Sequence, residues 1–561
     1  MYLDPITLEV MLNSFFSIVD EMEISLVKSA YSTNIKDRMD CSTAIYKIND
    51  EVVAQTELGA PIHLGTMSYA IPRILNEIPV EEMDEGDVII LNDPYPAGPG
   101  HLCDMMVVSP VFYKNDPVAL LANQAHHVDV GGYAPGSMPY GVDEIYQEGL
   151  RIPPTKIIKK GKLQNDIINL IKRNTRTERE FIGDFSAQVA ACKTGEQRLH
   201  ELFNKNGSEL TLNAMDDLIL YSENLMRKGI KDIPNGKYEF EDFVEGDGFT
   251  KKLIKIHVSL EIKDDEIIVD FSKSDKQVRG PVNGKIGNTA ATVYFVVKTI
   301  VNPDIPANRG VTNPIKIIAP EGSFVNASFP AAISNSNIIT TQRIADVLFG
   351  TFIQALPERC KAACAGTMNI FNIGGIDPRT GRYYSYVETY AGGQGASPVQ
   401  DGMDGVQTNM TNTRNAPAEA LEISYPFFIE KYGLRPDTEG AGTYRGGMGV
   451  IRVIKLLDHD ATITFGSDRN QLQPWGVFGG LSAKGAECQI VSPDGNQSEV
   501  FPKSTFKVKA ENKVYIKTPG GGGWGPPSKR DKKLVYDDIK LGLISQDRAN
   551  KIYDLEKNQN E

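Results

Sequence analysis

The stretch HLCDMMVVSPVFYKNDPVALLANQAHHVD, residues 101–129, decides how the chain arranges its most reactive side chains. Two runs of strand-forming residues flank a polar turn centred near residues 114–115, which predicts an antiparallel β-hairpin. In such a hairpin the start of one strand lies beside the end of the other, so Asp104 should lie opposite residue 125 or 126. The two runs are residues 105–112 and 118–124.

Three of the seven histidines in the chain, His101, His126 and His127, fall in this stretch. Two imidazoles and the Asp104 carboxylate at one end of a hairpin are a suitable ligand set for Zn²⁺, Mn²⁺ or Fe²⁺. Adjacent strand residues face opposite sides, so only one of His126 and His127 should bind a given metal, and the register leaves open which. The alternative is a set of hydrogen-bonded core histidines and loop-capping aspartates.

Three further features are weaker candidates. Asp40 ends the sequence DRMD, residues 37–40, which is either an ion-paired turn or the source of a fourth ligand. His63 is a lone histidine in PIHLG and is more typical of a core residue than of a ligand. The polar run TNMTNTR, residues 408–414, is either a solvated loop or a loop that contacts substrate or a partner.

Composition excludes several classes of function. The 561 residues carry 59 Lys and Arg against 72 Asp and Glu, a net charge of −13, which argues against nucleic acid or an anionic membrane as the main partner. The most apolar run, residues 289–301, contains Lys298 and is too short to span a bilayer. The first nine residues lack the basic start of a signal peptide. Six scattered cysteines without a CxxC pair fit reduced thiols, so we expect a cytoplasmic protein.

The chain has the organisation of a mixed α/β (α+β), multi-layer fold, with a helical insertion and a Gly-rich, β-rich C-terminal half. A long amphipathic helix is predicted over residues 4–31, and helices also over 289–300 and 341–356. Cys360 and Cys364 lie in a stretch that resembles a helix and are interpreted as core residues. Five regions are predicted: an α/β region with the candidate metal site (1–158), a helical segment (159–235), a mixed α/β region (236–380), a Gly-rich, β-rich region (381–527) and a charged C-terminal tail with one helix (528–561).

The chain contains no GxxxxGK[ST] sequence, the Walker-type phosphate loop. The glycine run at residues 520–523 is a weak signal for phosphate binding, because tight turns or close backbone approach explain it equally well.

Several separated motifs, in order along residues 4–527, resemble the hydantoinase B/5-oxoprolinase family. This family includes B subunits of ATP-dependent N-methylhydantoinases, the C-terminal half of 5-oxoprolinases, and subunits of acetone and acetophenone carboxylases. The motifs are NDPY (92–95), HxxD (101–104), HHxDxGG (126–132), PGSM (135–138), TQR (341–343), MTNTRN (410–415), LRPD (434–437), YRGG (444–447) and TPGGGG (518–523).

The resemblance implies a division of labour between two subunits. A partner A subunit with an actin-like ATPase fold binds ATP and phosphorylates the lactam or enol oxygen of the substrate, and the B subunit acts next at a metal site. The chain is therefore expected to belong to a hetero-oligomer that hydrolyses cyclic amides. The alternatives are an ATP-dependent carboxylase of a small ketone and a scaffold without catalysis. The chain is shorter than the acetone carboxylase subunit that it resembles, which favours the hydrolase.

The resemblance also implies site residues. The metal ligands of the carboxylase relatives fall on His101, Asp104, His126 and Asp40. With these four as ligands, we expect His127 or Asp129 to be the general base or orienting group. One departure is that the loop between residues 92 and 101 is one residue longer than the usual pattern, which leaves the choice between His126 and His127 open.

Overall fold

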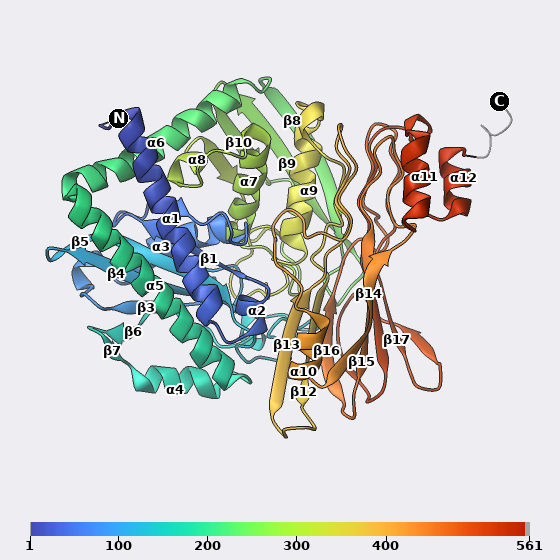
Figure 1. Cartoon of the computed structure of the whole chain (residues 1–561), viewed down its shortest axis with the longest axis horizontal. Helices are drawn as coiled ribbons and strands as arrows, with labels where there is room; N and C mark the ends of the chain where they lie inside the picture. Colours follow the sequence, from blue (N-terminus) through green and yellow to red (C-terminus); the bar gives the residue numbers. More distant parts are fainter. Residues whose placement is uncertain (1, 556–561) are drawn as a thin grey trace.

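The predicted hairpin lies near the centre of a seven-stranded sheet in the computed structural model, which describes residues 2–555 (Figure 1). The strand order is β2-β1-β5-β4-β3-β6-β7, and all neighbouring pairs are antiparallel. Cys41 pairs with Ala125 and Asp104 with His126, so the starts of β1 and β4 and the end of β5 lie at the same end of the sheet. The strands are β1 (Cys41–Tyr46), β2 (Val52–Gln55), β3 (Val88–Leu91), β4 (Asp104–Tyr113), β5 (Asp116–His126), β6 (Thr155–Lys159) and β7 (Lys162–Leu163).

Helices cover both faces of this sheet. Because successive side chains of a strand point to opposite faces, Ile45 packs in the core that includes Phe15 of α1, whereas Tyr46 packs in the cluster that includes Ile71 of α3. Burial on both faces explains why these strands are apolar without alternation. The covering helices are α1 (Pro5–Ser29) and α5 (Glu178–Asn206) on one face and α3 (His63–Glu77) on the other.

The predicted helical segment consists of α4, α5 and α6 and wraps the outside of the sheet (Figure 1). Gly195 of α5 allows close packing on α1, since a Cβ there would lie 2.5 Å from the sulfur of Met22. The short helix α2 follows α1 and leads into β1. The helices not yet given bounds are α2 (Thr33–Lys36), α4 (Asn165–Arg173) and α6 (Ser208–Lys231).

A second sheet, of order β11-β10-β9-β8, packs against α9, which in turn contacts α7. The pair β10–β11 is parallel and the other two pairs are antiparallel. The elements are β8 (Gly236–Glu245), β9 (Leu253–Lys263), β10 (Glu266–Asp270), α7 (Ile286–Val301), α8 (Arg309–Thr312), β11 (Ile315–Ile318) and α9 (Thr340–Phe352).

The C-terminal half is a β-sandwich of two sheets, of order β13-β12-β16-β19 and β14-β15-β20-β17-β18. Phe371 and Phe465 of the first sheet share a buried cluster with Phe427 and Ile454 of the second, which holds the two sheets together. The elements are β12 (Ile370–Ile376), β13 (Tyr383–Thr389), α10 (Ala418–Ser424), β14 (Phe427–Arg435), β15 (Gly449–Leu456), β16 (Ala461–Gly466), β17 (Glu487–Val491), β18 (Gln497–Glu499), β19 (Lys503–Val508) and β20 (Lys513–Lys517).

The glycine run at residues 520–523 lies within this half, packed against other backbone segments. A Cβ on Gly521 would lie 2.0 Å from the carbonyl oxygen of Gln394, and one on Gly522 would lie 2.0 Å from that of Trp475. Glycine is required there because two chain segments pass too close for any side chain. Close backbone approach therefore explains the run without a bound phosphate.

Two local predictions are wrong. The charged C-terminal tail has two helices rather than one, α11 (Lys532–Lys540) and α12 (Gln546–Tyr553), because Gly542 adopts a φ of +71° and turns the chain between them. The end of the tail, residues 556–561, lies outside the described part. The segment with Cys360 and Cys364 is not helical, because α9 ends at Phe352 and a single 3-10 turn follows. Both cysteines are buried, as expected.

The mixed α/β fold class is confirmed, with helices and four sheets in several layers. The division into five regions stays a prediction, and one hydrophobic core extends from Leu8 to Met410 across three of the proposed boundaries. All six cysteines are unpaired and buried. Within residues 2–555, every helix is too short or too polar to cross a membrane.

Candidate metal centre

The β4–β5 hairpin fixes the position of its polar end. Lys114 and Asn115 form its two-residue turn with φ of 54° and 71°, the left-handed conformation that matches the twist of the flanking strands. The register shifts by one residue between Val111 and Phe112, just before the turn. From Val111 back to Asp104 the pairing is uninterrupted, and it places Asp104 opposite His126. The predicted position, 125 or 126, is therefore resolved to 126.

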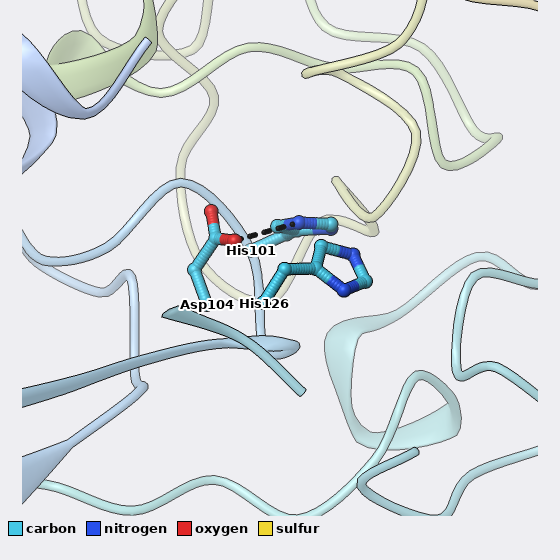
Figure 2. Close-up of side chains that lie close together, drawn as sticks. All are labelled: His101, Asp104 and His126. Atoms are coloured by element: carbon cyan, nitrogen blue, oxygen red, sulfur yellow. Dashed lines mark ion pairs between the residues drawn. The ribbon is translucent and has the colours of Figure 1, made fainter. Parts of the chain in front are cut away.

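His101, Asp104 and His126 converge at this end (Figure 2). All three are buried, and one ligand atom from each lies within 4.8 Å of the other two. Nε2 of His101 is 3.2 Å from Oδ1 of Asp104, and the ring centroids of the two histidines are 4.9 Å apart. Two imidazoles and one carboxylate in this arrangement are a ligand set that transition metals accept.

Neighbouring groups orient each of the three side chains. Nδ1 of His101 is 2.9 Å from the carbonyl oxygen of Ser334, which directs Nε2 of the ring to the cluster. Asn337 donates to Oδ2 of Asp104 at 3.1 Å, and Asn34 lies 3.1 Å from Nδ1 of His126. Such hydrogen bonds from outside a ligand set are characteristic of metal sites.

The loop before β4 holds His101 in place. Asn92 donates to the carbonyls of Leu102 and Leu150 and accepts from the amide of Ile152, so it ties both ends of the loop together. Gly100 leaves room for the amide of Asn337, because a Cβ at this position would lie 2.8 Å from it. These contacts hold His101 beside Asp104.

Asp104, His101 and His126 differ in how burial and neighbouring charges shift their pKa values. Burial alone would raise the pKa of Asp104, but the charge and hydrogen bond of His101 outweigh it and hold that pKa well below its usual range. Burial opposes the charge of His101, yet Asp104 raises the pKa of His101 above its ordinary value. Burial and then the like charge of His101 lower the pKa of His126 to about 4. His126 is therefore a neutral imidazole at pH 7, the form that binds metals.

Asp40 lies on the wall of the same cavity, just before β1. Its carbonyl oxygen accepts from the amide of His126 at 3.0 Å, and its carboxylate is 3.8 Å from the guanidinium of Arg38. Its negative charge favours the protonated form of both cluster histidines, which adds to the raised pKa of His101 and only partly offsets the lowered pKa of His126. Asp40 is outside the group of three whose ligand atoms lie within 4.8 Å. The cavity has a volume of about 30 Å³.

The structure does not bring His127 and Asp129 to the cluster. Nε2 of His127 is 2.9 Å from Oε1 of Gln188 of α5, and its ring lies beside Phe181 on the opposite side of β5 from His126. Asp129 is buried and accepts from the amides of Gly131 and Gly136 and from Arg176, with which it forms a 3.0 Å ion pair. Both side chains stabilise their surroundings and neither lines the cavity.

His63 lies beside the cluster, although the sequence around it is more typical of a core residue. It is the first residue of α3, only 1% exposed, and its Nε2 is 4.0 Å from Oδ1 of Asp104. The sequence around it carries no ligand spacing, so no signal distinguishes it from a core histidine. Asn337 was missed for the same reason, since 233 residues separate it from Asp104.

The run at residues 408–414 is a wall of the site rather than a solvated loop. Met410 and Thr411 are buried and line the cavity. Asn412 donates to the carbonyls of Leu58 and Gly59 at 3.0 Å each, which joins the C-terminal half to the segment before His63. The site is therefore enclosed by both halves of the chain.

The comparisons with known proteins agree with this architecture. The family model of hydantoinase B/oxoprolinase matches residues 4–527. The 5-oxoprolinase of Dictyostelium discoideum is 32% identical over 526 residues, which are 93% of this chain and 40% of that protein. The beta subunit of the caprolactamase of Pseudomonas jessenii is 31% identical over 562 residues, which are 97% of this chain and 95% of that relative. The chain thus spans about two fifths of the oxoprolinase and nearly all of the caprolactamase polypeptide.

Solved structures support the same relationship. The crystal structure of the ATP-dependent caprolactamase of Pseudomonas jessenii matches with a TM-score of 0.91 and 30% identity, over 99% of this chain and 96% of that chain. A nucleotide-free acetone carboxylase matches with the same TM-score of 0.91 but only 20% identity, over 98% of this chain and 79% of that chain, which shows a shared fold alone. The chain belongs to the hydantoinase B/oxoprolinase family.

Proposed function

We propose that this chain is the B subunit of an ATP-dependent cyclic-amide hydrolase of the hydantoinase/5-oxoprolinase type. The observation that carries the proposal is the buried convergence of His101, Asp104 and His126 in a chain of this family. A lactam resists hydrolysis because amide resonance stabilises it. Phosphorylation of its oxygen gives an imidate phosphate, whose carbon is a better electrophile.

The residues of the cluster fit a divalent metal. His101, Asp104 and His126 would hold it, with Asp40 as a fourth ligand if its side chain turns from Arg38. Nitrogen and oxygen donors suit zinc, manganese or iron, and they do not choose among them. Such an ion supplies a Lewis acid and lowers the pKa of a bound water molecule. His101 and Asp104 form an ion pair without it, so the proton of His101 must leave as the ion binds.

The substrate requires the walls of the site to separate. A cavity of about 30 Å³ has room for one or two water molecules but not for a lactam ring. Residues from both halves of the chain line it, among them Ile62 and Met410. Their separation would admit the substrate, and their closure would exclude bulk water.

In this proposal a partner subunit binds ATP and phosphorylates the substrate. Two relatives are named as single subunits of larger enzymes, the B subunit of a D-/L-hydantoinase and the beta subunit of a caprolactamase, which supports a hetero-oligomer with an A-type subunit. We assign ATP binding and phosphorylation to that A-type subunit, with the actin-like fold that the family resemblance implies. The complex is placed in the cytoplasm, where six unpaired cysteines would stay reduced.

For His127 and Asp129 we propose supporting roles in place of direct proton transfer. His127 anchors β5 to α5 through Gln188, and Asp129 closes the loop that follows β5. A displacement of His127 or Asp129 would move His126, because His127 follows it directly and Asp129 lies three residues after it.

Reconstitution with the partner tests the proposal. The chain would be purified with its A-type ATPase subunit and incubated with ATP and 5-oxoproline, hydantoin, caprolactam or acetone, with ¹³C-bicarbonate present. The expected result is ATP-dependent ring opening of a cyclic amide without incorporation of ¹³C. Incorporation of ¹³C into acetone would instead identify a carboxylase. A complex that turns over none of these and holds no metal would identify a scaffold.

A further inference from the structure

Ser42 of β1 and His63 of α3 form a hydrogen-bonded pair beside the metal centre. Nδ1 of His63 is 2.9 Å from Oγ of Ser42. The same hydroxyl donates to the carbonyl oxygen of Cys41 at 2.8 Å, with the carbonyl of Ala60 at 3.5 Å. A carbonyl oxygen can only accept, so when the hydroxyl proton points to the carbonyl of Cys41, the hydroxyl oxygen accepts from Nδ1 of His63. In this arrangement Ser42 keeps the proton of the neutral ring on Nδ1.

The other ring nitrogen of His63 then carries a lone pair that faces the cluster. Nε2 lies 4.0 Å from Oδ1 of Asp104, which is beyond hydrogen-bond distance. Two acceptors facing each other across such a gap need a donor between them. His63 and Asp104 both line the cavity of about 30 Å³, which has room for a water molecule. A water molecule there would donate to Nε2.

We infer that His63 is the base that accepts the proton of the attacking water, and that Ser42 positions it. The inference rests on the proposed function. One O–H bond of water breaks, its electron pair forms the new bond to the imidate carbon, and the proton passes to Nε2 of His63. The π pair of the C=N bond moves to the ring nitrogen, which takes the proton back from His63. Water is thereby added across C=N with no other reactant.

The surroundings of the Ser42–His63 pair suit a base that takes a proton from water better than the surroundings of His127 do. His127 uses its Nε2 on Gln188 and lies across β5 from the cluster. Ser42 also lines a second, outer cavity of about 300 Å³, bounded by Thr56 and Phe295. The Ser42–His63 pair thus lies between the metal centre and this outer cavity.

Gly59 provides an independent way to disturb the pair. A Cβ at this position would lie 2.3 Å from Oγ of Ser42, so the chain passes over the hydroxyl only because residue 59 has no side chain. Gly59→Ala should displace the hydroxyl and release His63 without altering either residue.

The experiment compares His63→Ala, His63→Gln, Ser42→Ala and Gly59→Ala in the complex with the A-type subunit. His200→Gln is the matched control, because His200 of α5 bonds to the carbonyl of Phe112 outside the cavity. Metal content, thermal melting, and the absorption spectrum of the Co²⁺-substituted protein are measured together with kcat and KM for ring opening. Free imidazole is added to His63→Ala to test chemical rescue.

We expect both His63 variants to retain wild-type metal content and Co²⁺ bands while kcat falls roughly 10²–10⁴-fold. Imidazole should restore part of kcat in His63→Ala but not in His63→Gln, where the amide fills the space. Ser42→Ala and Gly59→Ala should lower kcat less, with little change in KM. Loss of metal, altered Co²⁺ bands, or an unchanged kcat in His63→Ala would overturn the inference. A wild-type complex that opens no cyclic amide would instead contradict the proposed function.

Discussion

Asp104 and His126 are direct cross-strand partners at the end of the β4–β5 hairpin. The two-residue turn at Lys114 and Asn115 pairs Tyr113 with Asp116. The register shift between Val111 and Phe112 then moves the pairing by one residue, which places Asp104 opposite His126 instead of Ala125. Because side chains alternate along a strand, a one-residue slip would turn His126 away from Asp104 and bring His127 toward it. The turn and the register shift together select which histidine joins the cluster.

The first prediction concerns the cluster itself. His101→Ala and Asp104→Ala should each lose the metal and nearly all turnover, since each removes one of three converging donors. The fold should persist, because the hydrophobic core extends far beyond the site. Elemental analysis and circular dichroism measure the two properties. Asp116→Ala, an exposed aspartate at the turn of the same hairpin, is the control. Wild-type metal content in either cluster variant would contradict the assignment.

A second prediction concerns Asn337. It donates to Oδ2 of Asp104, so Asn337→Ala should leave the carboxylate free to rotate. Loss of such a supporting hydrogen bond typically lowers metal affinity roughly 10–100-fold. Competition with a chromophoric chelator measures the affinity. Asn412→Ala is a suitable comparison, because Asn412 bonds only to loop carbonyls. Equal affinities of the two variants would mean that Asn337 does not support the site.

The sequence predicts the part of the site that lies on the hairpin better than the residues that distant segments contribute to its walls. The hairpin, its turn and the convergence of His101 with Asp104 follow from spacing within residues 101–129, where strand geometry leaves few choices. His63 and Asn337 reach Asp104 through packing of distant segments, for which one sequence carries no periodic signal. The same reason explains why the sequence leaves two alternatives open for residues 408–414, where Asn412 bonds to the carbonyls of Leu58 and Gly59 in a distant segment.

A third prediction concerns the division of labour. The purified chain alone should hydrolyse neither ATP nor a lactam, because it has no Walker-type loop and its glycine run packs on backbone. Activity should arise on addition of an A-type ATPase subunit. Release of phosphate from ATP, measured with each protein separately and with both together, decides this. Sustained ATP hydrolysis by this chain alone would show that the assignment of ATP to the partner is wrong.

The fourth prediction concerns Glu23 of α1, whose carboxylate is buried beside Thr56 and Asp20. Burial raises the pKa of Glu23 from 4.5 to about 8. The folded state therefore keeps a proton that the unfolded state releases as the pH rises from 4.5 to 8. Across this window the group removes up to about 1.4 kcal/mol of stability per pH unit, and the effect is complete above pH 8.

Glu23→Gln should abolish this dependence, because the amide does not ionise. The variant should gain stability relative to wild type as the pH is raised from 5 to 8, as measured by urea unfolding at both values. Glu9→Gln, an exposed glutamate of the same helix, should track the wild type. A constant difference between Glu23→Gln and wild type at the two pH values would count against a protonated Glu23.

The last prediction separates the two adjacent histidines. His126→Ala should lose the metal, because its imidazole is one of the three converging donors. His127→Ala should keep the metal but melt at a lower temperature, since it leaves Oε1 of the buried Gln188 without a partner at a cost of about 1–3 kcal/mol. Metal content and thermal melting of both variants are the measurements. Exchanged phenotypes would mean that the register is shifted by one residue. A fall of roughly 10²–10⁴-fold in kcat of His127→Ala, with metal and melting temperature unchanged, would instead support the sequence-based expectation that His127 is the general base and would remove that role from His63.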